Sequence, residues 1–265
     1  ASTTKDGHGR TVSVTERVHA GSGLEVRETQ TEYLPTGEPT VIRRVRGSDS
    51  VVRWMRYDTL GRRVLNVEPN TSANFTATPP ADVSMIKAWR YAYDDAGQLV
   101  GTSDARSCGT NYFYDAAGRL TGEDYSPCMQ HQEPYSRVLD EENGAGMEVF
   151  HQFDTVDSEA SEVRAANPDC QLNPALYLGR LASSMDRGAK VVTGYDGRGR
   201  VVCAAKKVAR PDVRTGEIRQ RYAPRWYVQT AAFDAADRPI RENTGAATPQ
   251  LLGTGAKSEV TTGYT

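Results

Sequence analysis

The chain has 265 residues, 32 of them basic and 34 acidic, and its formal net charge of -2 gives it no general attraction to nucleic acid or to an anionic membrane surface. Val (24 residues) outnumbers Leu (13), and 25 Thr and 13 Tyr add to the same bias toward pleated, half-buried surfaces, which excludes an all-helical fold. The near-neutral charge excludes intrinsic disorder, and no apolar run approaches the ~18 residues of a membrane-spanning helix.

One short pattern recurs along the chain: an aromatic residue, Asp, two variable residues, Gly and Arg. The clear copies are Tyr57–Arg62, Tyr93–Gln98, Tyr114–Arg119 and Tyr195–Arg200. Copies that lack one or more elements are Lys5–Arg10, Tyr33–Gly37, Phe153–Asp157, Leu178–Leu181 and Phe233–Arg238. Repetition in a constant order is not chance, so the chain is built from repeats.

Each residue of the pattern suits a hairpin turn. The Asp carboxylate accepts hydrogen bonds from amides shortly after it, and Gly supplies the positive φ that reverses the chain. Asp237, which replaces Gly in one copy, tolerates the same left-handed geometry. Alternating apolar residues flank the turns, so every copy predicts two antiparallel strands joined by a tight turn.

A second turn signal follows several of the copies, at Glu68, Asp104, Asp186 and Asn243. Strand, turn, strand, turn is therefore the predicted unit. The longer gaps between copies predict loop insertions near 70–83, 127–146 and 167–174 that decorate one rim or face. Residues 158–166 favour a short helix, which the Pro of Asn167-Pro168 ends.

The Tyr-Asp-x-x-Gly-Arg copies, with strand-like flanks over nearly the whole chain, resemble the YD repeats of the Rhs family. That family includes bacterial Rhs polymorphic toxins, the B and C components of insecticidal toxin complexes, and the animal teneurins. The resemblance implies an all-β fold: a spiral antiparallel sheet of YD-repeat hairpins that forms part of a hollow shell. The family's C-terminal autoprocessing core and a toxin domain are not recognisable in residues 1–265, so we expect a single repeat segment of a longer shell protein.

We interpret the repeated residues as structural, because turn geometry and sheet packing explain them without a ligand. If the turn closes symmetrically, Tyr114 lies opposite Arg119, close enough for the guanidinium to stack on the ring of the same hairpin. The assigned motif residues are Tyr57, Asp58, Gly61, Arg62, Tyr93, Asp94, Gly97, Tyr114, Asp115, Gly118, Arg119, Tyr195, Asp196, Gly199, Arg200, Phe233, Asp234, Asp237 and Arg238.

The four cysteines suggest cross-links. Cys108 precedes one predicted strand and Cys128 follows the strand that returns from it, so the two lie within disulfide reach. Whether Cys170 meets Cys203 depends on the winding of the sheet, and four unpaired thiols remain the alternative. No Cys or His spacing indicates zinc.

Other candidate sites have simpler explanations. Gly197–Arg200 lacks the lysine and the following helix of a phosphate-binding loop, and Asp140–Glu142 lacks the alternating ligands of a calcium loop. No nucleophile, metal or paired-carboxylate arrangement is visible, so we expect no enzyme activity, no cofactor and no bound metal.

The leading functional hypothesis is a structural shell segment of a secreted or cell-surface protein, one that encapsulates or presents a toxin or effector polypeptide. Its expected partners are the remainder of a parent shell, other copies of itself or an enclosed polypeptide, without nucleic acid or membrane insertion. The alternative is a teneurin-like adhesion or glycan-binding module that uses a surface glycan or protein receptor. Trp54, Trp89 and Trp226 on one outer face would favour that alternative.

Overall fold

The computed structural model describes residues 1–21, 23–69, 71, 75–128, 139–211, 218–246 and 258–264. About 50% of the chain is strand and 5% is helix, which confirms the predicted all-β fold. The first strands are β1 (Ser2–Lys5), β2 (Thr11–Ala20), β3 (Gly23–Tyr33), β4 (Pro39–Arg46), β5 (Asp49–Tyr57), β6 (Arg63–Val67), β7 (Trp89–Tyr93), β8 (Leu99–Ser103) and β9 (Gly109–Tyr114). They are followed by β10 (Leu120–Ser126), β11 (Val149–Phe153), α1 (Ala160–Ala166), η1 (Pro174–Leu176), β12 (Leu181–Asp186), β13 (Ala189–Tyr195), β14 (Val201–Val208), η2 (Ile218–Arg221), β15 (Tyr227–Phe233), β16 (Pro239–Asn243) and β17 (Glu259–Thr261).

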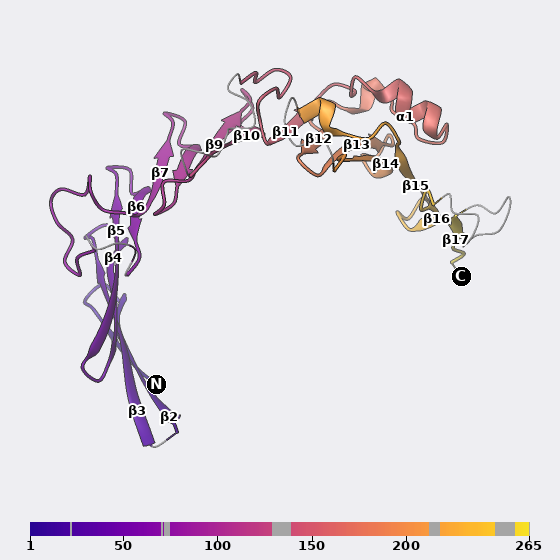
Figure 1. Cartoon of the computed structure of the whole chain (residues 1–265). Coiled ribbons are helices and arrows are strands. Elements are labelled where there is room, and N and C mark those ends of the chain that lie inside the picture. Colours follow the sequence, from indigo (N-terminus) through magenta and orange to yellow (C-terminus); the bar gives the residue numbers. More distant parts are fainter. Residues whose placement is uncertain are drawn as a thin grey trace. The chain divides into compact units, whose positions relative to one another are not determined.

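In the described part of the chain, each strand pairs with the next strand in sequence, and the seventeen strands form one antiparallel sheet (Figure 1). The predicted turn motifs join each odd-numbered strand to the even-numbered strand after it, from β1–β2 to β15–β16. The chain divides into two compact units, Ala1–Asn111 with Ser126–Gln132, and Tyr112–Tyr125 with Glu133–Thr265. The single repeat segment over 1–265 stays a prediction.

The core of the first unit lies on one face of β4, β5 and β6. Trp54 pairs with Val41 on one side and with Val67 on the other, so the three side chains form a row across the strands. All three are buried, with Val52 and Leu65 beside them. This row is the apolar half of the alternation that the sequence predicts for strands with one buried face.

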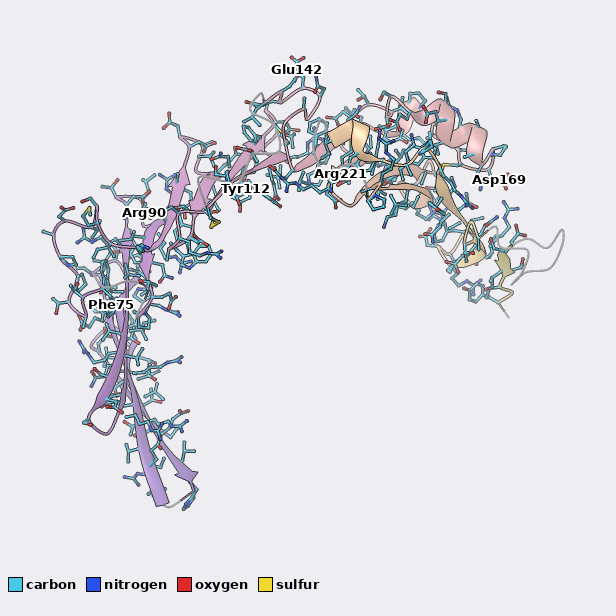
Figure 2. All side chains as sticks on the ribbon, viewed as in Figure 1. Phe75, Arg90, Tyr112, Glu142, Asp169 and Arg221 are labelled. Atoms are coloured by element: carbon cyan, nitrogen blue, oxygen red, sulfur yellow. A yellow bond between two sulfur atoms is a disulfide. The ribbon has the colours of Figure 1, made fainter. Side chains whose placement is uncertain are left out.

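The connection between β6 and β7 covers this core. Ile86 and Ala88 are buried in the same cluster, and Phe75 and Val83 pack against it. Trp54 donates from Nε1 to the carbonyl of Thr76 at 2.9 Å, which ties the loop to the strand. Figure 2 labels Phe75 and Arg90 in this region. The predicted insertion near 70–83 therefore covers a sheet face, and residues 70 and 72–74 of it lie outside the described part of the chain.

The second unit repeats this arrangement with a different cover. Val192, Ala205 and Val228 form a row across β13, β14 and β15. The segment between β11 and β12 lies over this row and contributes Ala160, Val163, Cys170 and Leu172 to the cluster. The short helix predicted from residues 158–166 is confirmed as α1, which ends at Ala166 with Asn167 as its C-cap, directly before Pro168.

A second cluster in this unit packs residues of β11 and β12 against residues just before β11 and after β14. It contains Met147, Phe150, Met185, Ile218 and Tyr222, all of them buried. Of the predicted insertion 127–146, residues 129–138 lie outside the described part of the chain, whereas residues 139–146 form a turn closed by the bridge between Asp140 and Ala145.

The adhesion or glycan-binding alternative would be favoured by three tryptophans on one outer face, but two of them are buried. Trp54 is 0% exposed and Trp226 is 8% exposed, whereas Trp89 is 42% exposed. The insertions explain the difference, because each buried ring lies beneath a loop whose packing is not visible in the local strand pattern. No helix in the described ranges is long and apolar enough to cross a membrane.

Candidate functional site

The repeat motif folds as one recurring turn, which Asp115 illustrates. Its Oδ1 accepts hydrogen bonds from the amides of Ala117 and Arg119, and its Oδ2 accepts one from Arg119 Nε at 2.7 Å. The amide of Gly118 donates to the Asp115 carbonyl at 2.9 Å. The same carboxylate contacts occur in the turns that begin at Asp6, Asp58, Asp196 and Asp234.

These contacts favour the charged carboxylate. The amide of Arg119 and its guanidinium together lower the pKa of Asp115 from its ordinary value. The pKa values of the other four turn aspartates are lowered in the same direction, although burial opposes the shift in each. The turn therefore holds its Asp ionised and bonded to the Arg four residues later.

The glycine position requires positive φ in these turns. Gly118 has φ of 78°, and Gly9, Gly61, Gly97 and Gly199 lie between 76° and 84°. Asp237 takes φ of 61° at the same place, as predicted from its tolerance of the left-handed region.

The symmetrical closure that the sequence suggested is wrong by one residue. Tyr57 pairs with Arg63, the residue after the motif Arg, and the register shifts between Arg56 and Tyr57. The same offset pairs Tyr33 with Pro39, Tyr93 with Leu99, Tyr195 with Val201 and Phe233 with Pro239. A β-bulge beside each turn therefore moves the Arg out of the position opposite its own aromatic residue.

The displaced Arg instead covers the aromatic ring of the following repeat. The Arg62 guanidinium lies 4.7 Å from the centre of the Tyr93 ring, a cation–π distance. The equivalent pairs are Arg10 with Tyr33 at 4.9 Å, Arg119 with Phe153 at 4.4 Å, Arg180 with Tyr195 at 5.4 Å, Arg200 with Phe233 at 4.9 Å and Arg238 with Tyr264 at 4.3 Å. The prediction that Arg119 stacks on Tyr114 of its own hairpin is therefore wrong, because Arg119 lies over Phe153 of the next repeat.

Hydrogen bonds connect the same consecutive repeats. Arg62 Nη1 donates to the carbonyl of Asp94 at 3.2 Å, and the Tyr93 hydroxyl donates to the carbonyl of Arg63 at 3.1 Å. The Arg-to-carbonyl bond recurs from Arg10 to Leu34 and from Arg200 to Asp234. The bond from a Tyr hydroxyl to a carbonyl recurs from Tyr33 to Thr11, from Tyr57 to Pro39, from Tyr195 to Leu181 and from Tyr264 to Pro239. We call this set of contacts the inter-repeat lock. In it, the motif Arg lies over the aromatic ring of the next repeat and donates to a backbone carbonyl there, and the Tyr hydroxyl of that next repeat donates to a backbone carbonyl of the first.

Two incomplete copies are halves of one repeat. Phe153 pairs with Leu181, and the amide of Asp154 donates to the carbonyl of Arg180 at 3.1 Å. Residues 155–178, which carry α1 and η1, are therefore inserted into the turn itself, between its Asp and its Gly179. The Asp154 carboxylate accepts the Gly179 amide at 2.6 Å and forms an ion pair with Arg119, which lowers the pKa of Asp154 to about 2.

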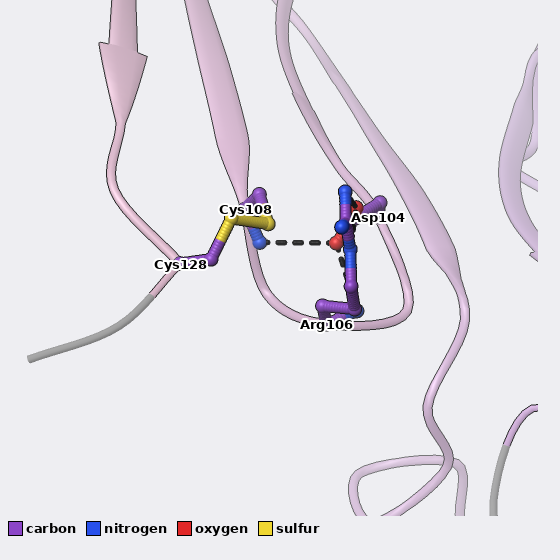
Figure 3. The surroundings of a disulfide bond; sticks show 4 residues. All are labelled: Asp104, Arg106, Cys108 and Cys128. Atoms are coloured by element: carbon purple, nitrogen blue, oxygen red, sulfur yellow. Dashed lines mark hydrogen bonds and ion pairs between the residues drawn. A yellow bond between two sulfur atoms is a disulfide. The ribbon is translucent and has the colours of Figure 1, made fainter. Parts of the chain in front are cut away.

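The second turn signal predicted at Asp104 is confirmed as a turn, and its geometry is that of the motif although it lacks both Gly and Arg. Asp104 Oδ1 accepts hydrogen bonds from the amides of Arg106 and Cys108 (Figure 3). Ser107 takes the positive φ of 73°. Cys108 occupies the place of the motif Arg and is joined to Cys128 in a disulfide. Asp followed by a residue tolerant of positive φ three positions later is the signal that identifies this turn.

The other two cysteines, Cys170 and Cys203, are also joined in a disulfide. Both are buried, with exposures of 0% and 1%. The sequence left open whether Cys170 meets Cys203. The two meet because the inserted segment, which carries Cys170, lies over β14, which carries Cys203.

A cleft of about 700 Å³ lies beside the split repeat of the second unit, lined by residues that include Asp115, Arg119, Glu142, His151 and Asp154. Glu142 is on the exposed loop labelled in Figure 2. Arg119 is already paired with two carboxylates, and burial lowers the pKa of His151. Among the described residues, no group of three or more His, Cys, Asp or Glu is placed to hold a metal ion.

No protein family model and no curated protein sequence matches the chain. Solved structures do match it. The crystal structure of TcdB2-TccC3-Cdc42 has a TM-score of 0.60 at 11% identity over 92% of this chain and 11% of that chain. TcdB2-TccC3 without the hypervariable C-terminal region and the Photorhabdus luminescens Tc holotoxin pore each have a TM-score of 0.61 at 11% identity, over 92% of this chain and 10% of the matched chain.

The chain spans about a tenth of the length of those toxin chains, and at this identity the likeness concerns the fold. The chain therefore has the β-sheet fold of the Rhs/YD-repeat shells, and the resemblance read from its turn motifs is confirmed at the level of the fold.

Proposed function

We propose that this chain is a section of the wall of an Rhs-like protein shell and that its role is structural. The observation that carries the proposal is the inter-repeat lock, which connects consecutive repeats at the turn end of the hairpins. The guanidinium of a motif Arg, such as Arg62, forms an ion pair with an Asp, a hydrogen bond to a backbone carbonyl and a cation–π contact with a ring, all within this chain. Residues committed to contacts within the wall suit a scaffold rather than a ligand site.

The wall would separate an enclosed polypeptide from the surroundings. A continuous sheet satisfies its backbone groups strand by strand and leaves unpaired strand edges only where it ends. We further propose that the remainder of such a shell, or other copies of this chain, continue the sheet, and that a toxin or effector segment is the enclosed polypeptide. The likeness to chains of a Tc holotoxin supports this proposal.

An exported location fits the cysteines. Both disulfides join residues that the fold places together, and disulfides persist in oxidising compartments. We therefore propose a secreted or surface-exposed protein without catalytic activity. The alternative of glycan binding drew on exposed tryptophans, and the burial of Trp54 and Trp226 leaves no observation in its favour.

Electron cryo-microscopy of the longest natural polypeptide that contains this sequence tests the proposal. The wall role predicts that β1–β17 form part of a continuous sheet around an enclosed volume, with density for a polypeptide inside. A structure in which both faces of these strands are open to bulk solvent would contradict the proposal.

A further inference from the structure

The segment inserted into the turn between β11 and β12 is held on the sheet by charges as well as by apolar contacts. We define residues 155–172 as the α1 cover. Asp157 forms an ion pair with Lys190 at 2.8 Å, and the two side chains are 0% and 1% exposed. Although burial alone would raise the pKa of Asp157, the Lys190 ammonium lowers it below the ordinary value, which favours the ionised carboxylate.

A second charged contact lies beside it. Lys207 on β14 forms ion pairs with Glu159 at 2.8 Å and with Glu162 at 2.9 Å. Its ammonium lies 4.6 Å from the centre of the Trp226 ring, and Trp226 Nε1 donates to Glu162 at 3.3 Å. The carboxylates of the cover thus contact Lys190 and Lys207 on the sheet and Trp226, which directly precedes β15.

The helix and the charged contacts of the cover contribute little independent stability, whereas Ala160, Val163 and Leu172 add apolar contacts with the sheet. The α1 helix has seven residues, too few for a helix that persists in water without packing. Buried ion pairs contribute little net stability, because the charges lose their hydration when the cover closes. Opening restores that hydration, which offsets part of the cost of exposing the apolar side chains Ala160, Val163 and Leu172.

The Cys170–Cys203 disulfide is the covalent restraint on this interface. It joins the cover to β14. Beyond the cover, Tyr177 is buried and its hydroxyl donates to the Thr193 carbonyl at 2.8 Å, which anchors the chain where it returns to the sheet. The segment between Asp154 and this anchor can therefore move while the strands remain paired.

From these contacts we propose that the α1 cover is a thiol-released device: reduction of Cys170–Cys203 lets the cover lift and exposes Lys190, Lys207 and Trp226 on the sheet. The reductant is a dithiol. Its two S–H bonds are oxidised to one S–S bond, the Cys170–Cys203 bond is reduced, and the two protons end on the cysteine sulfurs. Because both cysteines are buried, the attack occurs on a transiently open cover, and the partly exposed Cys108–Cys128 disulfide is reduced first.

The test uses the whole chain with Cys170 and Cys203 both replaced by Ser, and in parallel the unmodified chain with dithiothreitol. Trypsin cleavage after the exposed Arg164 of α1 reports opening, and the emission of Trp226 reports exposure of the sheet. The expected results are cleavage about tenfold faster and a red-shifted emission, with an unchanged strand signal in circular dichroism. The red shift should be absent when Trp226→Phe is added.

The matched control replaces Cys108 and Cys128 by Ser, which removes the other disulfide and should leave Arg164 protected. Cleavage and emission that do not change in the Cys170→Ser, Cys203→Ser chain would overturn the proposal. Loss of the strand signal together with cleavage would also overturn it, because the sheet would then have unfolded with the cover.

Discussion

The guanidinium of Arg62 lies 4.7 Å from the centre of the Tyr93 ring and donates to the carbonyl of Asp94, so a side chain from one turn covers the first residues of the next turn. The Tyr93 hydroxyl returns a hydrogen bond to the carbonyl of Arg63. The motif is therefore an inter-repeat connector as well as a turn, which explains why aromatic, Asp, Gly and Arg recur together.

The contribution of the Tyr hydroxyl bond to the inter-repeat lock can be tested by a substitution that removes only the hydroxyl oxygen. Tyr195→Phe deletes the bond to the Leu181 carbonyl at 2.8 Å and keeps the ring under Arg180. We expect a loss of about 0.5–1.5 kcal/mol in the free energy of unfolding, measured by urea titration. Tyr227→Phe, at a ring that is 43% exposed, is the control and should change it little. Equal effects of the two substitutions would argue against the hydroxyl bond.

The requirement for positive φ can be isolated within one turn. Gly9 has φ of 79°, Gly7 has an ordinary φ, and neither position has a heavy atom within 4 Å of an added Cβ. Gly9→Val should cost about 1–3 kcal/mol, because a β-branched side chain is strained in that conformation. Gly7→Val should be nearly neutral, since Thr59 occupies the equivalent place in another repeat. Thermal denaturation of the two variants compares them, and a smaller cost at Gly9 than at Gly7 would contradict the turn geometry.

The turn aspartates predict a loss of stability in acid. The pKa of Asp115 is lowered by the Arg119 amide and guanidinium, and the pKa of Asp154 is lowered to about 2 by Arg119. A carboxyl with a depressed folded pKa stabilises the protein above its unfolded pKa, and this contribution is lost as the pH falls through the folded pKa.

The melting temperature should therefore decrease between about pH 4 and pH 2, and these carboxyls should contribute no pH dependence between about pH 5 and pH 8. Asp154→Asn should reduce the acid sensitivity, because the amide does not titrate. A melting temperature that is constant down to pH 2 would show that the ion pairs of the turns do not contribute to stability.

The Cys108–Cys128 disulfide should contribute to the stability of the first unit. It closes a loop with a sequence separation of 20, and chain entropy gives such a cross-link roughly 3 kcal/mol. Replacement of both residues by Ser should lower the denaturation midpoint accordingly, measured by guanidinium titration. An unchanged midpoint would mean that the Asp104 turn holds this region without the cross-link.

Local chemistry made the turns predictable. Asp and Gly act within six residues, so the hairpins and the positive φ of Asp237 follow from the sequence itself. The register did not follow, because each turn contains a β-bulge beside its positive-φ residue, and the one-residue shift occurs also at Tyr93, where Gln98 replaces the motif Arg. The Phe153 and Gly179 halves looked separate because residues 155–178 come between them. Burial of Trp54 and Trp226 depends on loops far along the chain, which local alternation does not encode.

A double-mutant cycle tests the inter-repeat lock most directly. The single and double variants of Arg62→Leu with Tyr93→Leu measure the coupling across repeats, and Arg62→Leu with Tyr57→Leu measures the coupling within one hairpin. The lock predicts a coupling free energy of about 0.5–1 kcal/mol for Arg62 with Tyr93 and a value near zero for Arg62 with Tyr57. Coupling to Tyr57 and none to Tyr93 would show that the Arg stacks within its own hairpin, and the lock would have to be abandoned.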